Sequence, residues 1–265
     1  KKGKERMELV EGGCYEVQQL SRSIFSMVST MRHLTEDILQ QERQKRRKEL
    51  DVLQSQINPH FLYNTLDSIV WMTEAGRYQE SIEMVTSLAR FFRISLSKGR
   101  SMIPLADELE HARHYMNIQK IRYKNKFEFS MQIHPDTEGL YALKLSIQPI
   151  LENAIYHGIS GLDEDGEIRV EALRDKEDLV IRISDNGAGI PPAVAQTLLE
   201  EERPASHSKG SGIGLRNVHR RLRLYFGESY GLTVHSEPDE GTMVELRMPA
   251  LDRQQAQQYG REDVL

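Results

Sequence analysis

Apolar residues recur at intervals of three and four near the start of the chain. They are Val17, Leu20, Ile24, Met27, Met31, Leu34 and Ile38. This sustained spacing is typical of the seam along which helices pair, and it favours a coiled coil or parallel bundle over one face of a globular helix. The pattern stops at QQERQKRRKE (40–49) and resumes out of phase at Leu50, Leu53 and Ile57. We therefore expect a helix from about Tyr15 into the 70s whose second half packs differently from its first.

Two further segments predict a helical hairpin and a third helix. EAGRYQE (74–80) indicates a short turn, and the helix after it has one apolar side formed by Ile82, Val85, Leu88, Ala89, Phe92 and Leu96. SKGRSMIP (97–104) ends that helix, and the pattern of residues 105–123 predicts a third helix. Long helices joined by a short turn form an antiparallel hairpin with an apolar face, which dimerisation into a four-helix bundle would bury.

From Phe127 the pattern changes to short segments with alternating or β-rich composition. They are FEFSMQI (127–133), GEIRVEA (166–172), LVIRIS (179–184), LTVHS (232–236) and TMVELRM (242–248). Helices are predicted over LKLSIQPILENAIYHGI (143–159) and over 215–225. This order of elements predicts an α/β sandwich with helices on one face of the sheet. The polar tail after Pro249 is expected to be frayed.

Composition and charge exclude several classes of function. Hydrophobic residues make up 38% and charged residues 28%, which is typical of a soluble globular or partly coiled protein. The net charge of −5 argues against nucleic-acid binding by bulk electrostatics. Cys14 is the one cysteine, so an intrachain disulfide is excluded. No apolar run reaches membrane-spanning length, and the missing initiator methionine leads us to expect a fragment whose membrane segment lies upstream.

Two glycine-containing segments in the second half suggest a binding site. DNGAGI (185–190) places the Asp185 carboxylate at a strand end, where it can accept a hydrogen bond from an exocyclic amine. Its Gly187 and Gly189 allow another molecule to approach the backbone. In GSGIGLRN (210–217), three glycines precede a helix whose free amides favour bound phosphates; they are Gly210, Gly212 and Gly214. Each segment alone is weak evidence, because a glycine-rich turn is most often only a turn.

A third segment, LENAIYHG (151–158), adds oxygen and nitrogen ligands at helical spacing. Asn153 and His157 are four residues apart and share a helix face, and Glu152 lies beside them. An amide oxygen such as that of Asn153 suits Mg²⁺, which normally arrives with nucleotide phosphates. The polar stretch 191–209 between the two glycine clusters is long enough to form a lid.

In this order the three segments resemble the N, G1 and G2 boxes of the ATPase superfamily shared by DNA gyrase, the ninety-kilodalton heat-shock chaperones, histidine kinases and MutL repair proteins. The resemblance covers about 127–249. It implies a Bergerat-type ATP-binding domain, with a mixed, mostly antiparallel sheet and with ATP and Mg²⁺ as cofactors. Asp185 and Thr242 would bind the adenine, and Asn153 would hold the Mg²⁺.

The resemblance also assigns the remaining residues of the site. Gly210, Gly212 and Gly214 would shape the lid over the phosphates, His157 and Leu215 would contact the nucleotide, and Glu152 would polarise a water or assist the metal. Tyr156 departs from the pattern, because many relatives have a lysine there. The phosphate contact implied for that lysine must come from Lys209 or Arg216, or be missing.

The stretch QINPHFLYNTL (56–66) puts Pro59 and His60 together inside a predicted helix. An interior proline costs roughly 3 kcal/mol, so we expect the irregularity to serve the adjacent side chain. An exposed histidine is largely neutral at cellular pH and carries a nucleophilic nitrogen. Pro59 can bend the helix and turn His60 outward while Ile57 and Phe61 keep packing. On the residues alone, an ordinary helix histidine is an equally good reading.

INPHFLYN matches the phosphoacceptor motif of sensor histidine kinases of the LytS/YesM-like branch, and LADELEHARHYMNIQKIRY is also similar to that branch. Together with the three boxes, the resemblance to this branch covers about 49–249. It implies that His60 is phosphorylated from ATP and passes the phosphoryl group to an aspartate of a response regulator. Asn64 would orient a water that dephosphorylates the partner. Phe61 replaces the acidic base of better-known histidine kinases, so the base here is unidentified.

The resemblance implies four parts: a partial HAMP signalling helix at 1–48, dimerisation and phosphotransfer helices at 49–125, a catalytic ATP-binding domain at 126–250 and a tail at 251–265. It implies a homodimer that has a response regulator as partner, does not bind nucleic acid and forms the cytoplasmic portion of a bacterial cell-membrane protein.

Two other functions stay open, an ATP-hydrolysing clamp of the same superfamily and a catalytically degenerate signalling scaffold. His111 and His114 are compatible with metal binding, although a solvated helix face is favoured.

Overall fold

The computed structural model describes residues 23–24, 26–31, 34–35, 59–96, 101–124, 126–159, 165–199 and 213–259. The chain divides into two compact units, 1–62 and 63–265. Several predictions lie outside the described residues: the phase break at 40–49, most of the lid, and the residues Gly210, Gly212 and Lys209. Within the described ranges, no helix is both long and apolar enough to cross a membrane.

The first unit is described over short helical pieces. Its predicted seam residues Ile24, Met27, Met31 and Leu34 are 47%, 69%, 69% and 56% exposed. An exposed apolar seam is what helix pairing requires, and the pairing stays a prediction.

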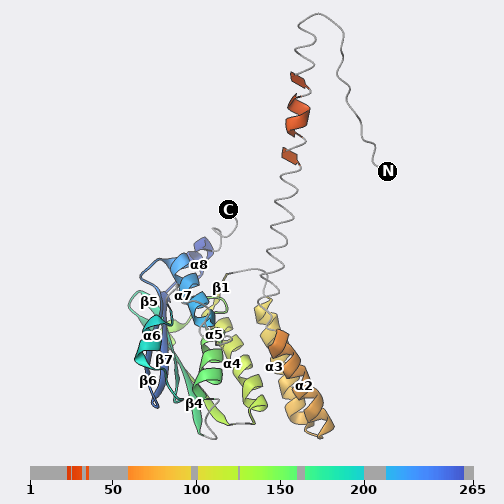
Figure 1. The fold of residues 1–265 in the computed structure, drawn as a ribbon, viewed down its shortest axis with the longest axis vertical. Coiled ribbons are helices and arrows are strands. Elements are labelled where there is room, and N and C mark those ends of the chain that lie inside the picture. The colour runs from red at the N-terminus through yellow and green to blue at the C-terminus, as the bar shows by residue number, and fades with distance from the viewer. Residues whose placement is uncertain are drawn as a thin grey trace, which may run out of the picture. The chain divides into compact units, whose positions relative to one another are not determined.

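The predicted hairpin is formed by α2 (Pro59–Glu74) and α3 (Tyr78–Ser95) (Figure 1). The turn between them closes with hydrogen bonds from Arg77 N to Met72 O at 2.8 Å and from Gly76 N to Thr73 O at 3.1 Å. Gly76 has a φ of 75°, a conformation that glycine adopts without steric cost. Thr73 and Ser81 join the two helices through their hydroxyls, 3.0 Å apart. The short turn predicted at 74–80 is confirmed.

Helix α3 packs against α4 (Leu105–Arg122), which matches the predicted third helix. The ring of Phe91 stacks on that of His111 with 4.3 Å between centroids, and Ser95 Oγ lies 2.8 Å from His111 Nε2. His114 is buried as well. The solvated face predicted for these two histidines is therefore wrong, because α4 is covered by neighbours along its length. In the described part of the chain, no cluster of three or more metal-binding side chains occurs.

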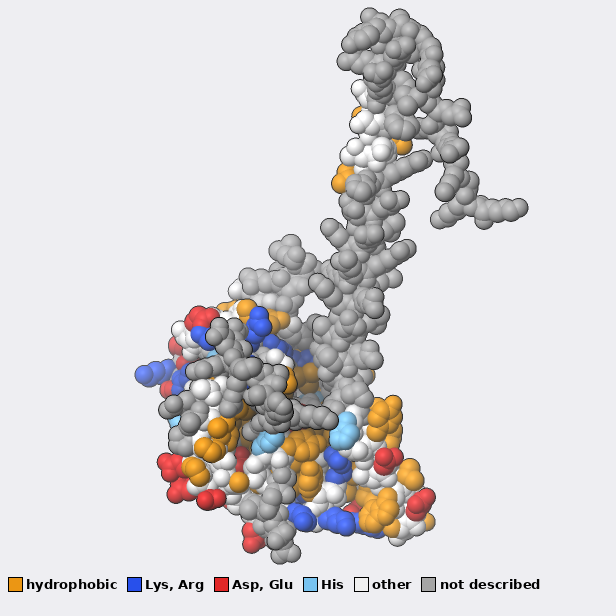
Figure 2. Space-filling view, in the orientation of Figure 1, with side chains coloured by type: hydrophobic (Ala, Val, Ile, Leu, Met, Phe, Trp, Pro, Cys, Tyr) orange, Lys and Arg blue, Asp and Glu red, His pale blue; other side chains and the backbone are white. Residues whose placement is uncertain are grey.

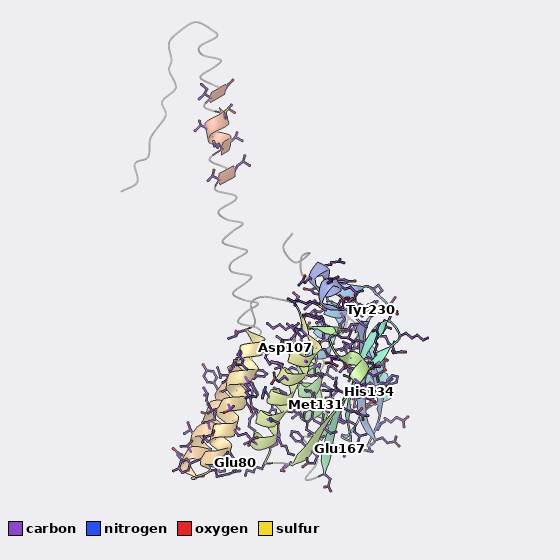
Figure 3. The ribbon with its side chains drawn as sticks, turned by 180° about the vertical axis from the view of Figure 1, so that it is seen from behind. Glu80, Asp107, Met131, His134, Glu167 and Tyr230 are labelled. Atoms are coloured by element: carbon purple, nitrogen blue, oxygen red, sulfur yellow. The ribbon has the colours of Figure 1, made fainter. Side chains whose placement is uncertain are left out.

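The second half contains a five-stranded sheet in the order β2-β4-β5-β7-β6. Its strands are β2 (Phe127–Ile133), β4 (Gly166–Asp175), β5 (Asp178–Asp185), β6 (Gly231–Glu237) and β7 (Gly241–Pro249). β2 and β4 are parallel, and the other neighbours are antiparallel. The mixed, mostly antiparallel sheet is confirmed, and each predicted strand is found. Figure 3 shows β2 and β4 from behind, with Met131 and Glu167 labelled.

Helices cover one face of this sheet, as predicted. Alternate residues of the strands are buried there, among them Ile168, Ile183 and Leu246. The covering helices are α4, α5 (Gln148–Asn153) and α7 (Ile213–Phe226), and α7 confirms the helix predicted at 215–225 (Figure 1). The other face is polar: Arg182 pairs with Glu171 at 3.5 Å and with Glu245 at 3.0 Å.

A second, two-stranded sheet was not predicted. It pairs β1 (Met102–Pro104) with β3 (Tyr141–Leu143) in antiparallel fashion, and a short 3₁₀ turn, η1 (Pro135–Thr137), precedes β3. The helix predicted at 143–159 consequently starts later, because Leu143 belongs to β3 and Leu145 has a φ of 56°. After α5 it continues as a π-helix, η2 (Ala154–Ile159).

The end of the chain is also more ordered than expected. Leu251 pairs with Tyr141 as an isolated bridge, and α8 (Arg253–Tyr259) follows. Ala256 is 2% exposed, and the ring of Tyr259 meets that of Phe226 at 5.3 Å. The frayed tail predicted after Pro249 is therefore wrong up to Tyr259, because buried apolar contacts hold this segment in place.

Candidate functional site

The ends of three adjacent strands bring together one carboxyl and two hydroxyl groups. Asp185 pairs with Thr242 across β5 and β7, and Thr242 pairs with Ser236 across β7 and β6. Ser236 Oγ donates to Gly241 O at 2.8 Å and accepts from Ile190 N at 2.8 Å. The two hydroxyls are 2.8 Å apart. Because a hydroxyl has a single proton, the Thr242 hydroxyl donates to Ser236 and keeps lone pairs able to accept.

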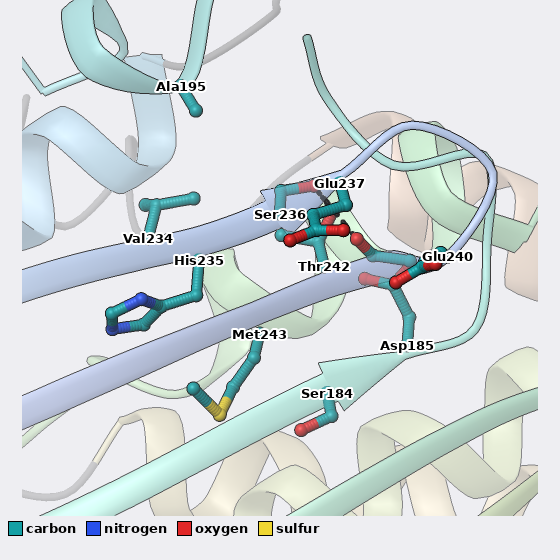
Figure 4. A pocket seen from close by; sticks show the side chains of 11 residues that line it. Ser184, Asp185, Ala195, Val234, His235, Ser236, Glu237, Glu240, Thr242 and Met243 are labelled. Atoms are coloured by element: carbon teal, nitrogen blue, oxygen red, sulfur yellow. Dashed lines mark hydrogen bonds between the residues drawn. The ribbon is translucent and has the colours of Figure 1, made fainter. Parts of the chain in front are cut away.

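These residues line a cavity of about 610 Å³, a size typical of sites for small molecules (Figure 4). The Asp185 side chain points toward the β6–β7 turn, where Glu240 lies, and His235 and Met243 line the opposite part. Ala195 of α6 (Pro192–Thr197) also borders the cavity, so the first part of the predicted lid region reaches it.

The end of the π-helix lies directly against the Asp185 loop. A Cβ atom on Gly158 would lie 2.5 Å from Asp185 Oδ1, and one on Gly187 would lie 2.2 Å from the carbonyl carbon of Gly158. Ala188 N also donates to Gly158 O at 3.3 Å. The close approach predicted at Gly187 is therefore made by the chain's own backbone. Gly158 is a site residue that the sequence reasoning missed, although it belongs to the LENAIYHG segment.

Gly189 fixes the second half of the same loop. Its φ is 67°, and a Cβ there would lie 2.0 Å from Glu237 O, so only glycine fits. The side chain of Asn186 holds the other half: Oδ1 accepts from Glu167 N at 2.6 Å, and Nδ2 donates to Asp165 O at 2.9 Å. The loop that follows Asp185 is thus held in one conformation by its neighbours.

Burial changes the acidity of the central carboxyl group. It raises the pKa of Asp185 to about 6, while hydrogen bonds from the backbone N–H groups of Gly187 and Thr242 oppose the shift. The Gly187 N–H lies 3.0 Å from Oδ1. Asp185 is therefore largely ionised at neutral pH, and an ionised carboxylate in a half-buried site is a strong acceptor for an amine.

Helix α5 and the π-helix carry the next set of predicted residues. Burial raises the pKa of Glu152, whose Oε1 accepts from Gln148 Nε2 at 2.8 Å. Asn153 is half-buried, and its side chain makes no hydrogen bond among the described residues. Tyr156 and His157 are exposed. π-Helical turns occur frequently at functional sites, and this one begins directly after Asn153.

The start of α7 lies beside the start of α5. A Cβ on Gly214 would lie 3.3 Å from Pro149 Cβ, so the glycine allows the two helices to approach closely. Leu215 is 1% exposed and belongs to the core, which leaves only its backbone for the predicted nucleotide contact. Arg216 Nε is buried and has no hydrogen-bond partner in the described ranges. That orphaned donor suits the phosphate contact predicted for Lys209 or Arg216.

The predicted phosphoacceptor lies in the first turn of α2. His60 is exposed, and Asn64, four residues on, is half-buried. Phe61 is 3% exposed, which agrees with its predicted packing role. The residues before Pro59 lie outside the described part of the chain, so the bend at that proline stays a prediction.

Comparisons with known proteins match two families to successive parts of the chain. Residues 48–127 match the family described as "Histidine kinase", and residues 141–252 match "Histidine kinase-, DNA gyrase B-, and HSP90-like ATPase". The fold and these matches define the class, a histidine kinase helical region followed by an ATP-binding domain.

Its relatives include two sensor histidine kinases and a sensor protein. The chain is 33% identical over 234 residues to "Sensor histidine kinase YesM" of Bacillus subtilis, covering 88% of this chain and 39% of that protein. It is 34% identical to "Sensor histidine kinase BtsS" of Escherichia coli (80% and 36% covered) and 28% identical to "Sensor protein LytS" of Bacillus subtilis (92% and 41% covered). The chain therefore belongs to the sensor histidine kinases of the LytS/YesM-like branch. It spans about two fifths of the length of these relatives.

Proposed function

We propose that this chain is the kinase portion of a two-component sensor, which phosphorylates its own His60 from ATP and passes the phosphoryl group to an aspartate of a response regulator. The observation that carries the proposal is the combination, in one chain, of an exposed histidine in the first turn of α2 with the cavity that contains Asp185 and Thr242. The relatives are sensor histidine kinases, and histidine kinase helices precede the ATPase domain here. The clamp and scaffold alternatives are not favoured by these matches.

In this proposal the adenine occupies the cavity at the ends of β5 and β7. The Asp185 carboxylate accepts a hydrogen bond from the exocyclic amine, and the Thr242 hydroxyl oxygen accepts from a water beside the ring. Gly158 keeps a side chain away from the carboxylate, and Gly187 and Gly189 let the loop after Asp185 lie against the backbone of Gly158 and Glu237. Arg216, whose Nε has no partner among the described residues, contacts a phosphate in place of the lysine that Tyr156 replaces.

Asn153 is the residue that would hold Mg²⁺. Its amide oxygen is available, since the side chain makes no hydrogen bond within the described ranges. Mg²⁺ normally arrives with nucleotide phosphates, so a single amide oxygen suits it as a protein ligand. When bound, Mg²⁺ neutralises charge on the phosphates. Glu152 accepts from Gln148 beside Asn153 and would assist this site, and His157 would contact the nucleotide.

The proposed reaction forms a bond between a ring nitrogen of His60 and the γ-phosphorus, and breaks the bond to the bridging oxygen, so that ADP leaves with the electron pair. A carboxylate oxygen of the response regulator then attacks the phosphorus and releases the imidazole. Positioning and charge neutralisation dominate such transfers. The buried phenyl group of Phe61 cannot act as a base, so His60 reacts without an acidic neighbour at that position. Asn64, one turn after His60, would orient a water for dephosphorylation.

The hairpin offers the surface for the proposed homodimer. Five of its exposed apolar residues, called here the hairpin surface, are Tyr63, Leu66, Val70, Ile82 and Val85, at 66%, 44%, 56%, 59% and 48% exposure. Figure 2 shows hydrophobic side chains gathered over this part of the molecule. Large apolar side chains exposed in this number on one hairpin support an interaction site there. We further propose that 1–48 is a partial HAMP helix that connects the kinase to a membrane segment, with the kinase in the bacterial cytoplasm.

Incubation with γ-labelled ATP and Mg²⁺ tests the proposed function. We expect label on the protein in an acid-labile, base-stable form, and none on His60→Ala. Label retained by that variant would overturn the assignment of His60. Label recovered only as free phosphate would support the ATP-hydrolysing clamp. A protein that is not labelled and does not bind nucleotide would support the scaffold.

A further inference from the structure

A buried carboxylate in the first turn of α4 binds a turn that lies 37–39 residues further along the chain. Glu108 is 0% exposed. Its Oε2 accepts from Leu145 N at 3.0 Å, and its Oε1 accepts from Ser146 N at 2.9 Å and from Ile147 N at 3.1 Å. Burial of a carboxylate is costly unless hydrogen bonds satisfy it, so a site with three amide donors indicates a specific role.

The three amides belong to the turn from which α5 starts. The first amides of a helix have no partner within the helix, and Ile147, the N-cap residue of α5, makes no side-chain cap. Glu108 therefore holds, from another helix, the N-cap residue of α5 and the two residues before it. Leu145 has a φ of 56°, which a non-glycine residue adopts at some cost and keeps only where its surroundings hold it. Without the carboxylate, this turn has less to hold it.

The carbonyl groups of the same turn are bound from the opposite side. Arg221 of α7 donates to Lys144 O at 2.8 Å and to Leu145 O at 3.5 Å. Burial raises the pKa of Glu108, and the three amide hydrogen bonds and the nearby Arg221 charge oppose the shift. The turn at 144–147 is thus held on its N–H side by α4 and on its C=O side by α7, the helix that follows the second glycine cluster.

The turn at 144–147 positions the elements of the candidate nucleotide site. Helix α5 ends at Asn153 and continues into the π-helix, whose Gly158 contacts the Asp185 loop. The first turn of α7 carries Arg216, and Gly214 lies against the start of α5. A shift of the turn would therefore displace three residues together. They are Asn153, proposed to hold Mg²⁺, Arg216, proposed to contact a phosphate, and Gly158, which lies against Asp185.

We propose that Glu108, assisted by Arg221, is a positioning residue that sets nucleotide affinity by fixing the start of α5 relative to α7. The inference rests on the proposed function, because it assumes that the site binds ATP. Glu108 does not touch the nucleotide in this account. It acts through the backbone of the turn at 144–147.

Glu108→Gln is the direct test, because the amide keeps the volume but turns an NH₂ group toward backbone N–H donors. Gln119→Met is the matched control: Gln119 is also buried in α4, and its hydrogen bonds to Tyr115 and Arg122 stay within that helix. Both variants are expected to melt at lower temperature than the parent chain. Binding of a fluorescent ADP analogue, measured where both are fully folded, is expected to weaken about tenfold or more in Glu108→Gln only. Amide hydrogen exchange at 145–147 should accelerate in the same variant.

Equal ADP affinity in the two variants would overturn the proposal, and so would unchanged exchange at 145–147 in Glu108→Gln. If Glu108→Gln does not fold, Arg221→Gln is measured in its place, since Arg221 is partly exposed and holds the same turn. An unaltered ADP affinity in that variant would then count against the proposal. If the parent chain itself binds no nucleotide, the proposed function fails, and the exchange at 145–147 still decides whether Glu108 holds the turn.

Discussion

Gly158 on the π-helix and Asp185 at the end of β5 are so close that a methyl group on Gly158 would lie 2.5 Å from Asp185 Oδ1. Real Cβ atoms do not approach an oxygen this closely, so any side chain must displace either the carboxylate or the helix end. A glycine at position 158 is therefore required for the Asp185 carboxylate, which is predicted to bind adenine, to occupy its observed position.

From this contact we predict that Gly158→Ala weakens ADP binding at least tenfold, because the carboxylate moves out of the cavity. Isothermal titration calorimetry measures the effect. Gly139→Ala is the control: Gly139 has a φ of 77°, so alanine strains the backbone there, but its Cβ would meet nothing within 4 Å. If the two variants lose the same affinity, the contact with Asp185 has no part in binding.

Replacement of Asp185 is expected to stabilise the ligand-free protein while it removes nucleotide binding. The pKa of Asp185 is about 6 in the folded chain against 3.8 for the free side chain. The protonated Asp185 side chain therefore stabilises the fold fully below pH 3.8, and this stabilisation is lost as the pH rises to about 6. At neutral pH the buried charge costs on the order of 3 kcal/mol. Asp185→Asn removes that cost and should unfold at higher denaturant concentration. A lower denaturant midpoint for Asp185→Asn at neutral pH would show that the buried charge does not destabilise the fold.

Nucleoside binding by the parent chain should depend on the same titration. Protonation of Asp185, whose pKa is about 6, removes the acceptor charge that the adenine amine requires. We expect affinity to be constant above about pH 7 and to fall below about pH 6, by up to about tenfold per pH unit. Adenosine is the suitable ligand, because it has no phosphate groups that titrate in this range. A flat profile down to about pH 5 would separate Asp185 from adenine recognition.

A charge on the hairpin surface is expected to separate the proposed dimer. Val85→Glu places a carboxylate among exposed apolar residues, and burying it unpaired in an interface would cost several kcal/mol. Analytical ultracentrifugation should show monomers for this variant. Glu83→Lys, on the same helix and also exposed, is the control and should leave the association unchanged. A dimeric Val85→Glu would move the interface elsewhere.

Local pattern was sufficient for most of the regular structure. Alternation predicted β2, β4, β5, β6 and β7, because each strand has one face against the helices and one toward water. The short elements were missed, since β1 and β3 have three residues each and cannot show a period. α8 was missed for a different reason: its polar sequence has one buried residue, Ala256, and its order comes from that contact.

For the site, the sequence by itself determined which candidate groups the chain offers: a carboxylate at a strand end, glycine clusters before a helix, and a histidine in a hairpin. It could not determine the partners of these groups. Ser236 has no motif, and it enters the site only because three strands place it beside Thr242. Glu108 and the turn at 144–147 are far apart in the chain, and no local pattern relates a buried acid to three distant amides. Buried polar groups must find hydrogen-bond partners once water is removed, and which partners they find depends on packing in three dimensions. Only the tertiary structure decided these partners.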